Sequence, residues 1–269
     1  GRAMVNLQDL FYRYFEVLTE QDAPDVANEA QKLRYQVYCL ETGFEDASQF
    51  PDNKEVDAFD ARSVHCILRH RQTGIVAATV RLVLPEVGGL FPIEEHCASS
   101  FETAGLDRSQ LPLNSLAEIS RFGVSRDFKR RLGEAGTLTG IGPNMDMSAF
   151  EKVQSDSIRL IPHISLGLFA AIVRLSADHH ITHWYAVMEP ALLRLLTRFG
   201  IVFQPIGDIV EYHGKRQPVY GCANDILEGM WKERRDVWEL ITGNGTVWPS
   251  PENYIVDDLQ SRLSGGRSC

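Results

Sequence analysis

The chain has 269 residues, of which 44% are hydrophobic and 23% charged, a composition typical of a globular protein with a sizeable core. It carries 27 basic and 36 acidic residues, a formal net charge of -9. General nucleic-acid binding requires a basic face, so we expect no nucleic-acid partner.

The cysteines and the apolar runs indicate a location inside the cell. Five cysteines without a CxxC pair favour reduced thiols over a disulfide framework. The longest apolar runs, such as LGLFAAIV at 166–173, are far shorter than the roughly 18–20 residues of a membrane span. No signal peptide is visible at the first residues. We therefore expect a cytoplasmic protein.

The first third of the chain predicts two helices and a hairpin. Apolar residues recur at helical spacing over 5–20, and a second helix is predicted over 24–42, with Gly43 just past its end. After an acidic loop, apolar runs predict strands over 64–70 and 74–85, joined by the turn RQTG. These two strands form an antiparallel hairpin.

The rest of the chain alternates strands and helices. The segment 85–115 predicts only a short helix near 93–101, and the stretch AEISRFGVS at 117–125 predicts a strand. The elements expected after it are a basic turn at 125–131, a glycine-rich segment at 132–144, a strongly apolar helix over 162–180, a strand at 183–190, a short helix at 191–200, a strand at 201–207, a last strand or hairpin at 210–222 and a C-terminal helix over 225–242.

This order of elements predicts the fold class. An antiparallel hairpin that leads into a strand–helix–strand crossover gives a mixed sheet. We expect an α/β fold in which helices flank a mixed central sheet, with N- and C-terminal helical extensions. No repeat or long disordered linker interrupts the chain. A single domain is therefore predicted over 1–269, with a core at about 25–222 and a C-terminal helical extension at about 223–269.

Several charged residues stand where charge is unusual. Arg34, Tyr38 and Glu41 fall at i, i+4 and i+7 on one helix face, which on its own favours a solvated Arg34–Glu41 ion pair. Arg81 interrupts an apolar strand and is costly there unless it is paired or faces solvent.

The segment EVDAFD crowds Glu55, Asp57 and Asp60 within six residues. It lacks the glycine and the distal glutamate of a calcium loop. Such a cluster is either solvated or holds an ammonium or guanidinium group, and Arg34 or Arg81 can supply the latter. A buried network of Arg81, Asp57, Asp60, Glu118 and Arg121 is the alternative to solvated charges.

Strand alternation separates the polar residues of 117–125. Glu118, Ser120 and Phe122 should share one face, and Ile119, Arg121 and Gly123 the other. Glu118 and Arg121 therefore need not pair with each other, and Arg121 should find a different carboxylate.

Neither a metal site nor a serine-hydrolase elbow is indicated. The histidines at 65, 70, 179, 180 and 183 match no zinc motif, and no GxSxG sequence is present. We expect no metal.

Four motifs in the same order resemble those of acyl-homoserine-lactone synthases, which are enzymes of the GNAT acyltransferase fold. They are Arg34-x-x-Val-Tyr38, the acidic segment 55–60, Arg81 late in a strand, and the stretch Glu118–Phe122. The resemblance covers roughly residues 30–125, and the later elements agree with it to about residue 207. Residues 65–85 are also similar to the acyltransferases that accompany the PEP-CTERM/exosortase system and to N-acyl amino acid synthases.

The resemblance implies an enzyme that moves a fatty acyl chain from acyl-acyl-carrier-protein, or acyl-CoA, to the amine of an amino acid or related small molecule. The resemblance also implies that no cofactor is tightly bound and that the acyl-phosphopantetheine thioester is the co-substrate. Glu118 is implied as the catalytic base. The implied binding residues are Arg34, Tyr38, Asp57, Asp60, Arg81, Ser120 and Arg121 for the small substrate, and Phe122, Gly123 and Val124 for acyl-pantetheine.

The implied donor is a carrier protein. The basic residues Arg126, Lys129, Arg130 and Arg131 form either an ordinary solvated turn or a patch that steers an acidic partner, and with the resemblance we favour docking of acyl carrier protein. The irregular phosphate-binding signature after Val124 agrees with this donor. Peripheral membrane contact through a lipid product is a further expectation.

Two alternatives to an N-acyl amino acid synthase remain. One is an acyl-homoserine-lactone synthase that uses S-adenosylmethionine. In those enzymes a tryptophan usually follows the helix motif, where this chain has CLETGFED. The other is a non-catalytic module that binds an acyl chain or a carrier protein.

Overall fold

The computed structural model describes residues 6–99, 101, 105, 107–133 and 147–252. The glycine-rich segment expected at 132–144 lies almost wholly outside them. The chain forms two compact units: Gly1–Ala58, Val64–Arg81 and Arg121–Ala171 make the first, and Phe59–Ser63, Leu82–Ser120 and Ile172–Cys269 the second. Three strands contribute residues to both units, and the single domain stays a prediction.

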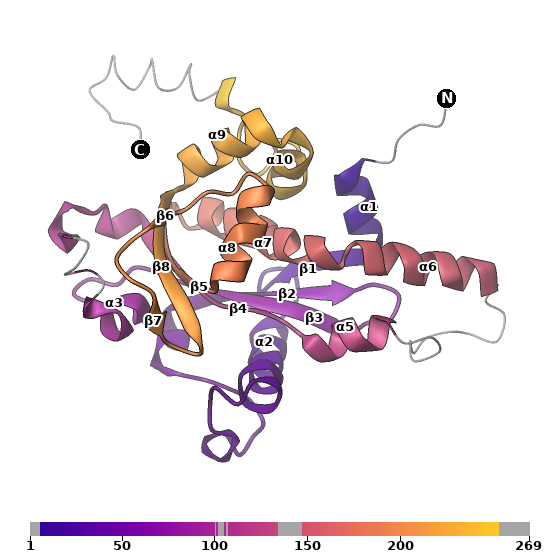
Figure 1. Cartoon of the computed structure of the whole chain (residues 1–269), viewed down its shortest axis with the longest axis horizontal. Coiled ribbons are helices and arrows are strands. Elements are labelled where there is room, and N and C mark those ends of the chain that lie inside the picture. The colour runs from indigo at the N-terminus through magenta and orange to yellow at the C-terminus, as the bar shows by residue number, and fades with distance from the viewer. Residues whose placement is uncertain (1–5, 100, 102–104, 106, 134–146, 253–269) are drawn as a thin grey trace. The chain divides into compact units, whose positions relative to one another are not determined.

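The strands form one sheet in the order β1-β2-β3-β4-β5-β8-β6, and β7 pairs with β8 (Figure 1). Their bounds are β1 Phe15–Thr19, β2 Ser63–His70, β3 Val76–Val83, β4 Leu116–Val124, β5 His183–Met188, β6 Gln204–Pro205, β7 Val210–Glu211 and β8 Lys215–Cys222. The β4–β5 pair is parallel, whereas β1–β2 and β5–β8 are antiparallel. The predicted mixed α/β sheet is confirmed.

Helices account for most of the remaining described residues. They are α1 Leu7–Tyr14, α2 Val26–Arg34, α3 Pro92–His96, α5 Arg126–Gly133, α6 Met147–Arg159, α7 Ile164–Asp178, α8 Pro190–Arg198, α9 Ala223–Glu233 and α10 Arg235–Thr242. Most follow the predicted pattern, and the expected C-terminal helix is divided into α9 and α10.

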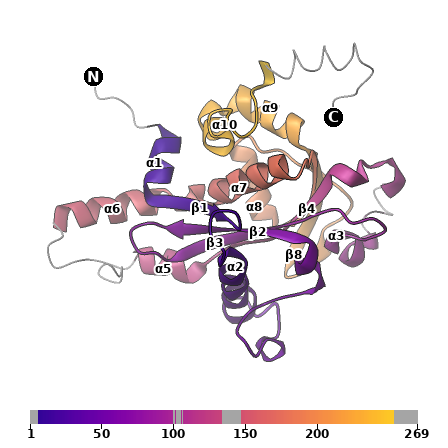
Figure 2. The same ribbon diagram turned by 180° about the vertical axis from the view of Figure 1, so that it is seen from behind.

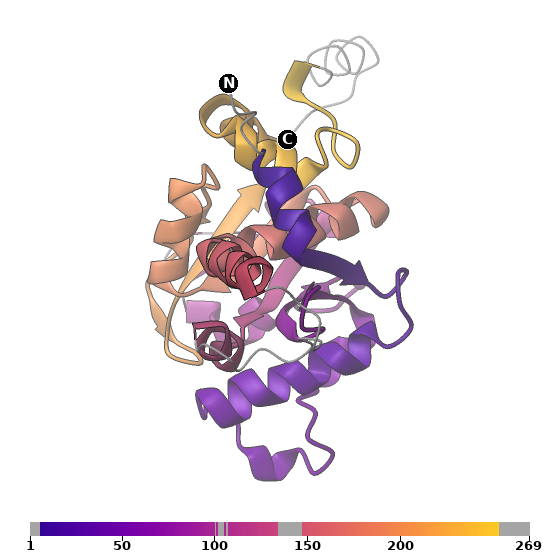
Figure 3. The same ribbon diagram turned by 90° about the vertical axis from the view of Figure 1, so that its right-hand side faces the viewer.

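The helix predicted over 5–20 is wrong in its second half. Residues 15–19 form strand β1, which pairs with β2 from Phe15↔His70 to Thr19↔Cys66, and Figure 3 shows α1 running directly into it. Phe15 is fully buried, and Arg69 Nη1 on β2 forms an ion pair with Glu16 Oε1 on β1 at 3.3 Å. The apolar segment is too short for its spacing to distinguish a helix from a strand. Pairing with the neighbouring strand β2 decides in favour of a strand.

The second predicted helix is confirmed, with a change of type inside it. Helix α2 continues as the π-helix η1, Tyr35–Glu41. Val26 and Ala30 pack on Ile67 of β2, and the buried residues Val37 and Tyr38 continue this contact surface; Figure 2 shows α2 beside these strands. The wider π turn redirects the side chains at the end of the helix.

Helix α7 is the long apolar helix that the sequence predicts. By length and composition Ile161–Asp178 is apolar enough to cross a membrane, with a mean hydropathy of 1.2, but 67% of it is buried inside the protein. In the first unit, a Cβ on Gly167 would lie 2.5 Å from the side chains of Leu68 and Phe11. The glycine therefore lets α7 approach its neighbours closely.

The core of the second unit gathers around β5. A cluster of buried residues joins Phe91, Ile93, Leu116 and Tyr185, and Trp184 donates to Ser176 Oγ at 2.9 Å. Strand β8 covers the whole length of β5, from His183↔Cys222 to Met188↔Gln217. This apolar packing surrounds the first half of β4.

The expectation of reduced cysteines holds in part. Cys39, Cys66 and Cys97 are free and buried. Cys222 is disulfide-bonded, so for this residue the expectation was wrong.

Candidate active site

Strand β4 changes its geometry in the middle. It pairs with β5 from Leu116↔His183 to Ile119↔Ala186, although β4 itself continues to Val124. Arg121 has a φ of 53°, a left-handed backbone that is unusual for a residue with a side chain. Such a distortion ends regular pairing and redirects side chains, as β-bulges beside active sites do.

Glu118 lies on β4 before this distortion and is 3% exposed. The Ile93 backbone N–H donates to Glu118 Oε1 at 2.7 Å. This N–H belongs to the first turn of α3, which has no partner within the helix. The Glu118 carboxylate is thus held in place by a main-chain donor and enclosed by the apolar cluster around β5.

Burial raises the pKa of two groups beside Glu118. Burial, with a smaller contribution from the Glu118 charge, raises the pKa of Cys97 to about 11. Burial, followed by the charge of Glu94, also raises the pKa of Tyr185, whose fully buried hydroxyl makes no hydrogen bond in the part of the chain that the structure describes. Tyr185 is the β5 partner of Glu118 in the parallel register.

A network of buried charges forms in the first unit around Glu55. Arg34 Nε and Nη2 donate to Glu55 Oε1 and Oε2 at 3.1 and 3.0 Å, a bidentate pair with side chains 0% and 1% exposed. Arg121 Nε donates to Glu55 Oε1 at 2.7 Å. One buried carboxylate therefore holds two guanidinium groups.

Asp57 extends the network to a third arginine. Arg81 Nη1 and Nη2 donate to Asp57 Oδ1 and Oδ2 at 2.6 and 3.2 Å. Arg121 Nη2 lies 3.4 Å from Asp57 Oδ2 and 3.9 Å from Glu45 Oε1. Arg81 is therefore paired, as expected for a charged residue in an apolar strand. Arg121 pairs with carboxylates other than Glu118, as strand alternation predicts.

The charge balance of this network is visible in Glu55. Burial on its own raises the pKa of the Glu55 carboxyl, but Arg121 and Arg34 lower it, and the net pKa is below its ordinary value. Tyr38 completes the cluster, because the Arg121 guanidinium lies over its ring at 5.3 Å. A Cβ on Gly123 would lie 3.4 Å from the Tyr38 hydroxyl, so Arg121 and Gly123 face the same side of β4, as alternation predicts.

The structure places the residues predicted from sequence in three groups. The first unit brings together Arg34, Tyr38, Asp57, Arg81 and Arg121. Glu118 and Ser120 are buried at the second unit's end of β4, and Asp60 is half-buried in the 3-10 helix η3, Ala58–Arg62. Phe122, Gly123 and Val124 follow the distortion, beyond the last β4–β5 register pair.

One partner, Glu45, was missed. Glu55 was expected in an acidic cluster that is either solvated or holds a guanidinium group of Arg34 or Arg81, and the structure confirms the pairing with Arg34. The expected Arg34–Glu41 pair is wrong, because Arg34 turns to Glu55 and the π-helix carries Glu41 toward α5. Arg121 also pairs with Glu55, which lies 66 residues away in the chain, and this pair leaves no local signal in the sequence.

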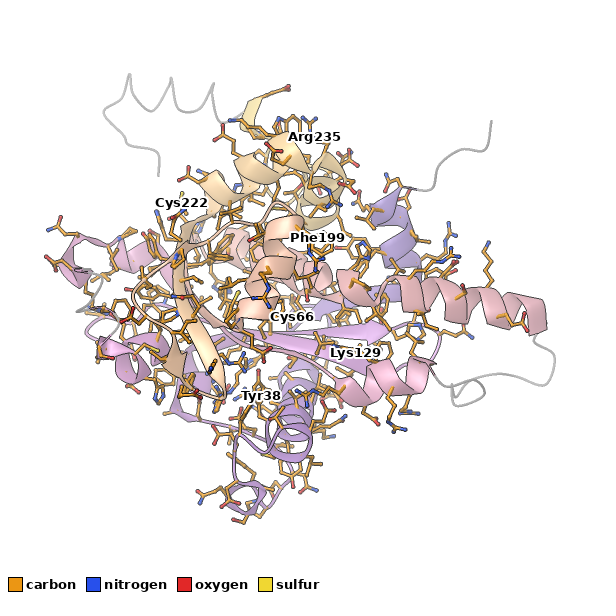
Figure 4. All side chains as sticks on the ribbon, in the orientation of Figure 1. Tyr38, Cys66, Lys129, Phe199, Cys222 and Arg235 are labelled. Carbon is orange, nitrogen blue, oxygen red and sulfur yellow. The ribbon has the colours of Figure 1, made fainter. Side chains whose placement is uncertain are left out.

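The basic segment expected as a turn is the helix α5, Arg126–Gly133. Arg126, Lys129 and Arg130 are exposed and Arg131 is half-buried; Figure 4 labels Lys129 on α5 and Tyr38 on η1. The apolar side chains of Phe128 and Leu132 are buried and make the segment amphipathic, which favours a helix over a turn.

Metal ligands do not gather within the described ranges: no group of three or more His, Cys, Asp or Glu side chains there is placed to hold an ion.

Part of the chain matches a known domain family. Residues 33–138 match the acetyltransferase (GNAT) domain family, a stretch that contains every residue given a role from sequence, from Arg34 to Arg131. No curated protein matches the chain by sequence.

Solved structures match its fold at low identity. The acyl-homoserine lactone synthase LasI aligns at a TM-score of 0.52 and 16% identity, over 78% of this chain and 89% of its own. The CoA-dependent synthase BjaI, with SAM and isopentyl-CoA, aligns at 0.54 and 17%, over 86% and 88%. TofI, in a ternary complex with an inhibitor and MTA, aligns at 0.55 and 17%, over 84% and 97%.

Residues 33–138 thus match a GNAT acetyltransferase domain, and the fold of the chain is similar to that of the acyl-homoserine lactone synthases. Together these matches support an acyltransferase.

Proposed function

We propose that the protein is an N-acyltransferase that moves a fatty acyl chain from acyl-acyl-carrier-protein to the amine of an amino acid or related small molecule, and so makes an N-acyl amino acid. One observation carries the proposal. Strand β4 joins a buried carboxylate, Glu118, to a segment, Phe122–Val124, that lies beyond its pairing with β5. The first supplies a base, and the second supplies main-chain groups for the pantetheine amides.

The reaction requires proton removal from the acceptor. An ammonium group loses one proton to Glu118, directly or through water, and the amine attacks the thioester carbonyl. A C–N bond forms, the C–S bond breaks, and the second amine proton leaves as the pantetheine thiolate is protonated. The products are an amide, a thiol and one proton. Glu118 suits the role because the main-chain N–H of Ile93 fixes its orientation.

The charged network provides acceptor recognition in this proposal. Its arginines are nearly closed to solvent, at 0% for Arg34 and 1% for Arg81, whereas the carboxylates Asp57 and Glu45 are 29% and 32% exposed. The accessible edge of the network is therefore negative and favours the ammonium group of an acceptor. Asp57 also pairs with Arg81. It can therefore bind the ammonium group of the acceptor and hold a guanidinium group at the same time, the two roles that the sequence suggests for the acidic cluster.

Helix α5 supports a carrier-protein donor. Its exposed basic residues begin two residues after the segment assigned to pantetheine, in a chain whose net charge is -9. An acidic carrier protein is attracted to such a patch. BjaI, which has a similar fold, is described as a CoA-dependent synthase. The fold alone therefore does not decide whether the acyl donor of this protein is a carrier protein or coenzyme A. The PEP-CTERM/exosortase association, the cytoplasmic location and membrane contact through the product stay predictions.

The experiment follows thiol release by the purified protein, with acyl carrier protein thioesters and a panel of amino acids, and includes an arm with S-adenosylmethionine. We expect transfer to an amino acid, and loss of at least about 100-fold in kcat for Glu118→Gln. Gln can still accept the Ile93 N–H, so the fold is kept. Glu94→Gln is the control, because Glu94 likewise accepts a main-chain N–H, that of Phe91, at 3.0 Å.

Three results would contradict the proposal. Lactone formed only with S-adenosylmethionine would make the protein a lactone synthase. No transfer with any donor would favour a binding module. Transfer by Glu118→Gln at the wild-type rate would show that another group is the base.

A further inference from the structure

Glu41 holds the N-terminus of α5. The backbone N–H groups of Arg126 and Asp127 donate to Glu41 Oε1 and Oε2 at 2.9 and 3.3 Å. Ser125 Oγ lies 3.4 Å from Glu41 Oε2 and also accepts the Phe128 N–H at 3.0 Å. The first main-chain donors of the helix are therefore satisfied by side chains of the protein itself.

Gln36 fixes the position of this carboxylate. Its side-chain amide donates to Glu41 Oε2 at 2.8 Å and to Ser125 Oγ at 3.2 Å. Gln36 and Glu41 both lie on the π-helix η1, whose wider turn brings them to α5. Glu41 is thus ordered from two sides before any substrate arrives.

The surroundings of Glu41 are negative. An open pocket of about 680 Å³ is lined by Glu41, Asp52 and Asp127, with Lys32 as its basic residue. A helix N-terminus ordinarily favours a phosphate, through its free N–H groups and the helix dipole. Here those N–H groups are occupied, and the adjoining pocket repels anions.

We propose that Glu41 is a specificity-determining residue that disfavours donors with a diphosphate, and so selects acyl carrier protein over acyl-CoA. The inference rests on the proposed function. Helix α5 begins two residues after Val124, the end of the segment assigned to pantetheine. Coenzyme A carries a diphosphate next to its pantetheine, whereas a carrier protein carries one phosphodiester. A carboxylate at this place penalises the more highly charged group more strongly.

The test measures binding and turnover for Glu41→Gln. Gln keeps an oxygen for the Arg126 N–H but removes the charge. We expect free coenzyme A to bind about tenfold more tightly by calorimetry, and kcat/KM for acyl-CoA to rise by a similar factor. Binding of pantetheine, which has no phosphate, and kcat/KM for acyl-acyl-carrier-protein should change less than about twofold. Glu41→Ala, which also opens the helix N-terminus, should raise coenzyme A affinity further.

Asp52→Asn is the matched control, because Asp52 lines the same pocket and the change removes the same charge. Unchanged coenzyme A affinity in both Glu41 variants would overturn the inference. An equal gain in Asp52→Asn would also overturn it, since the effect would then come from general charge.

Failure of the proposed function gives a different result. In that case the wild type transfers no acyl group from any donor, while the calorimetric comparison of Glu41→Gln and Asp52→Asn still decides the role of Glu41.

Discussion

Glu55 lies between two arginines that are 87 positions apart in the sequence, Arg34 and Arg121, and it is 1% exposed. A buried ion pair contributes little net stability when complete, because desolvation offsets the attraction. Removing one partner is costly, because it leaves the others charged and unpaired. At the scale of single residues, the cluster therefore depends on Glu55, which the sequence had indicated only as one member of an acidic cluster.

Glu55→Gln should lower the free energy of unfolding by about 3–5 kcal/mol, because two guanidinium groups lose their anion. Urea unfolding measures this. Glu29→Gln is the control, since its pair with Lys32 is exposed on the helix surface and contributes at most about 1 kcal/mol. Equal stability losses in the two variants would contradict a buried network centred on Glu55.

His70 should make stability depend on pH. It is fully buried between the rings of Phe15 and Phe128, and its ring nitrogens lie 2.9 Å from Thr73 Oγ1 and 3.0 Å from Ser157 Oγ. Burial lowers the pKa of His70 to about 4, while the unfolded chain keeps about 6.5. The unfolded state therefore binds more protons between these values.

The His70 contribution is complete above pH of about 6.5 and falls by about 3 kcal/mol as the pH drops toward 4. Denaturant unfolding at several pH values measures this slope. His70→Gln should remove it, whereas substituting the exposed His180 by Asn should keep it. A slope that survives in His70→Gln would assign the pH dependence to other groups.

At the scale of elements, sequence predicts whatever a local pattern determines. The hairpin β2–β3, strand β4 and helix α7 follow from alternation and apolar runs. Strand β1 was wrongly predicted as part of a helix, because its structure depends on pairing with a partner strand. Helix α5 was wrongly predicted as a turn, because its helical structure depends on an apolar side that is buried in the protein. The pairing of Arg121 with Glu55 was beyond prediction for the same reason, because these two residues meet only after the chain has folded.

Close packing of α7 is testable at Gly167. Alanine there would bring a Cβ to 2.5 Å from Leu68 Cδ1 and Phe11 Cζ, and should cost about 1–3 kcal/mol in the free energy of unfolding. The control is Gly229→Ala in α9, where the nearest atom to the new Cβ is Gly200 O at 3.8 Å. That change should stabilise by up to about 1 kcal/mol through helix propensity. A stabilised Gly167→Ala would contradict the packing.

Helix α5 should contribute to donor use through its charge. Lys129→Glu should lower kcat/KM for acyl-acyl-carrier-protein by roughly 3- to 10-fold at low salt, and the difference should vanish near about 1 M salt, where screening acts over roughly 3 Å. Lys232→Glu reverses an exposed charge on α9 and should have no effect. Equal effects of the two reversals would show that net charge, and not α5, attracts the carrier protein.

At the scale of the whole molecule, three observations support the proposed amine acylation: the GNAT domain match over 33–138, a fold similar to that of acyl-homoserine lactone synthases, and a buried glutamate on β4. Order of elements and four short motifs already indicated this class from sequence. The acyl chain and the acceptor depend on shape and charge that no motif of this chain encodes.

Mass spectrometry of organic extracts from cells that overproduce the protein tests the central claim most directly. The wild type should yield a new acylated amine whose fragments show an amino acid head group and a fatty acyl chain, and cells that produce Glu118→Gln to the same level should lack it. No new acylated amine from the wild type, or equal amounts from both, would contradict the account.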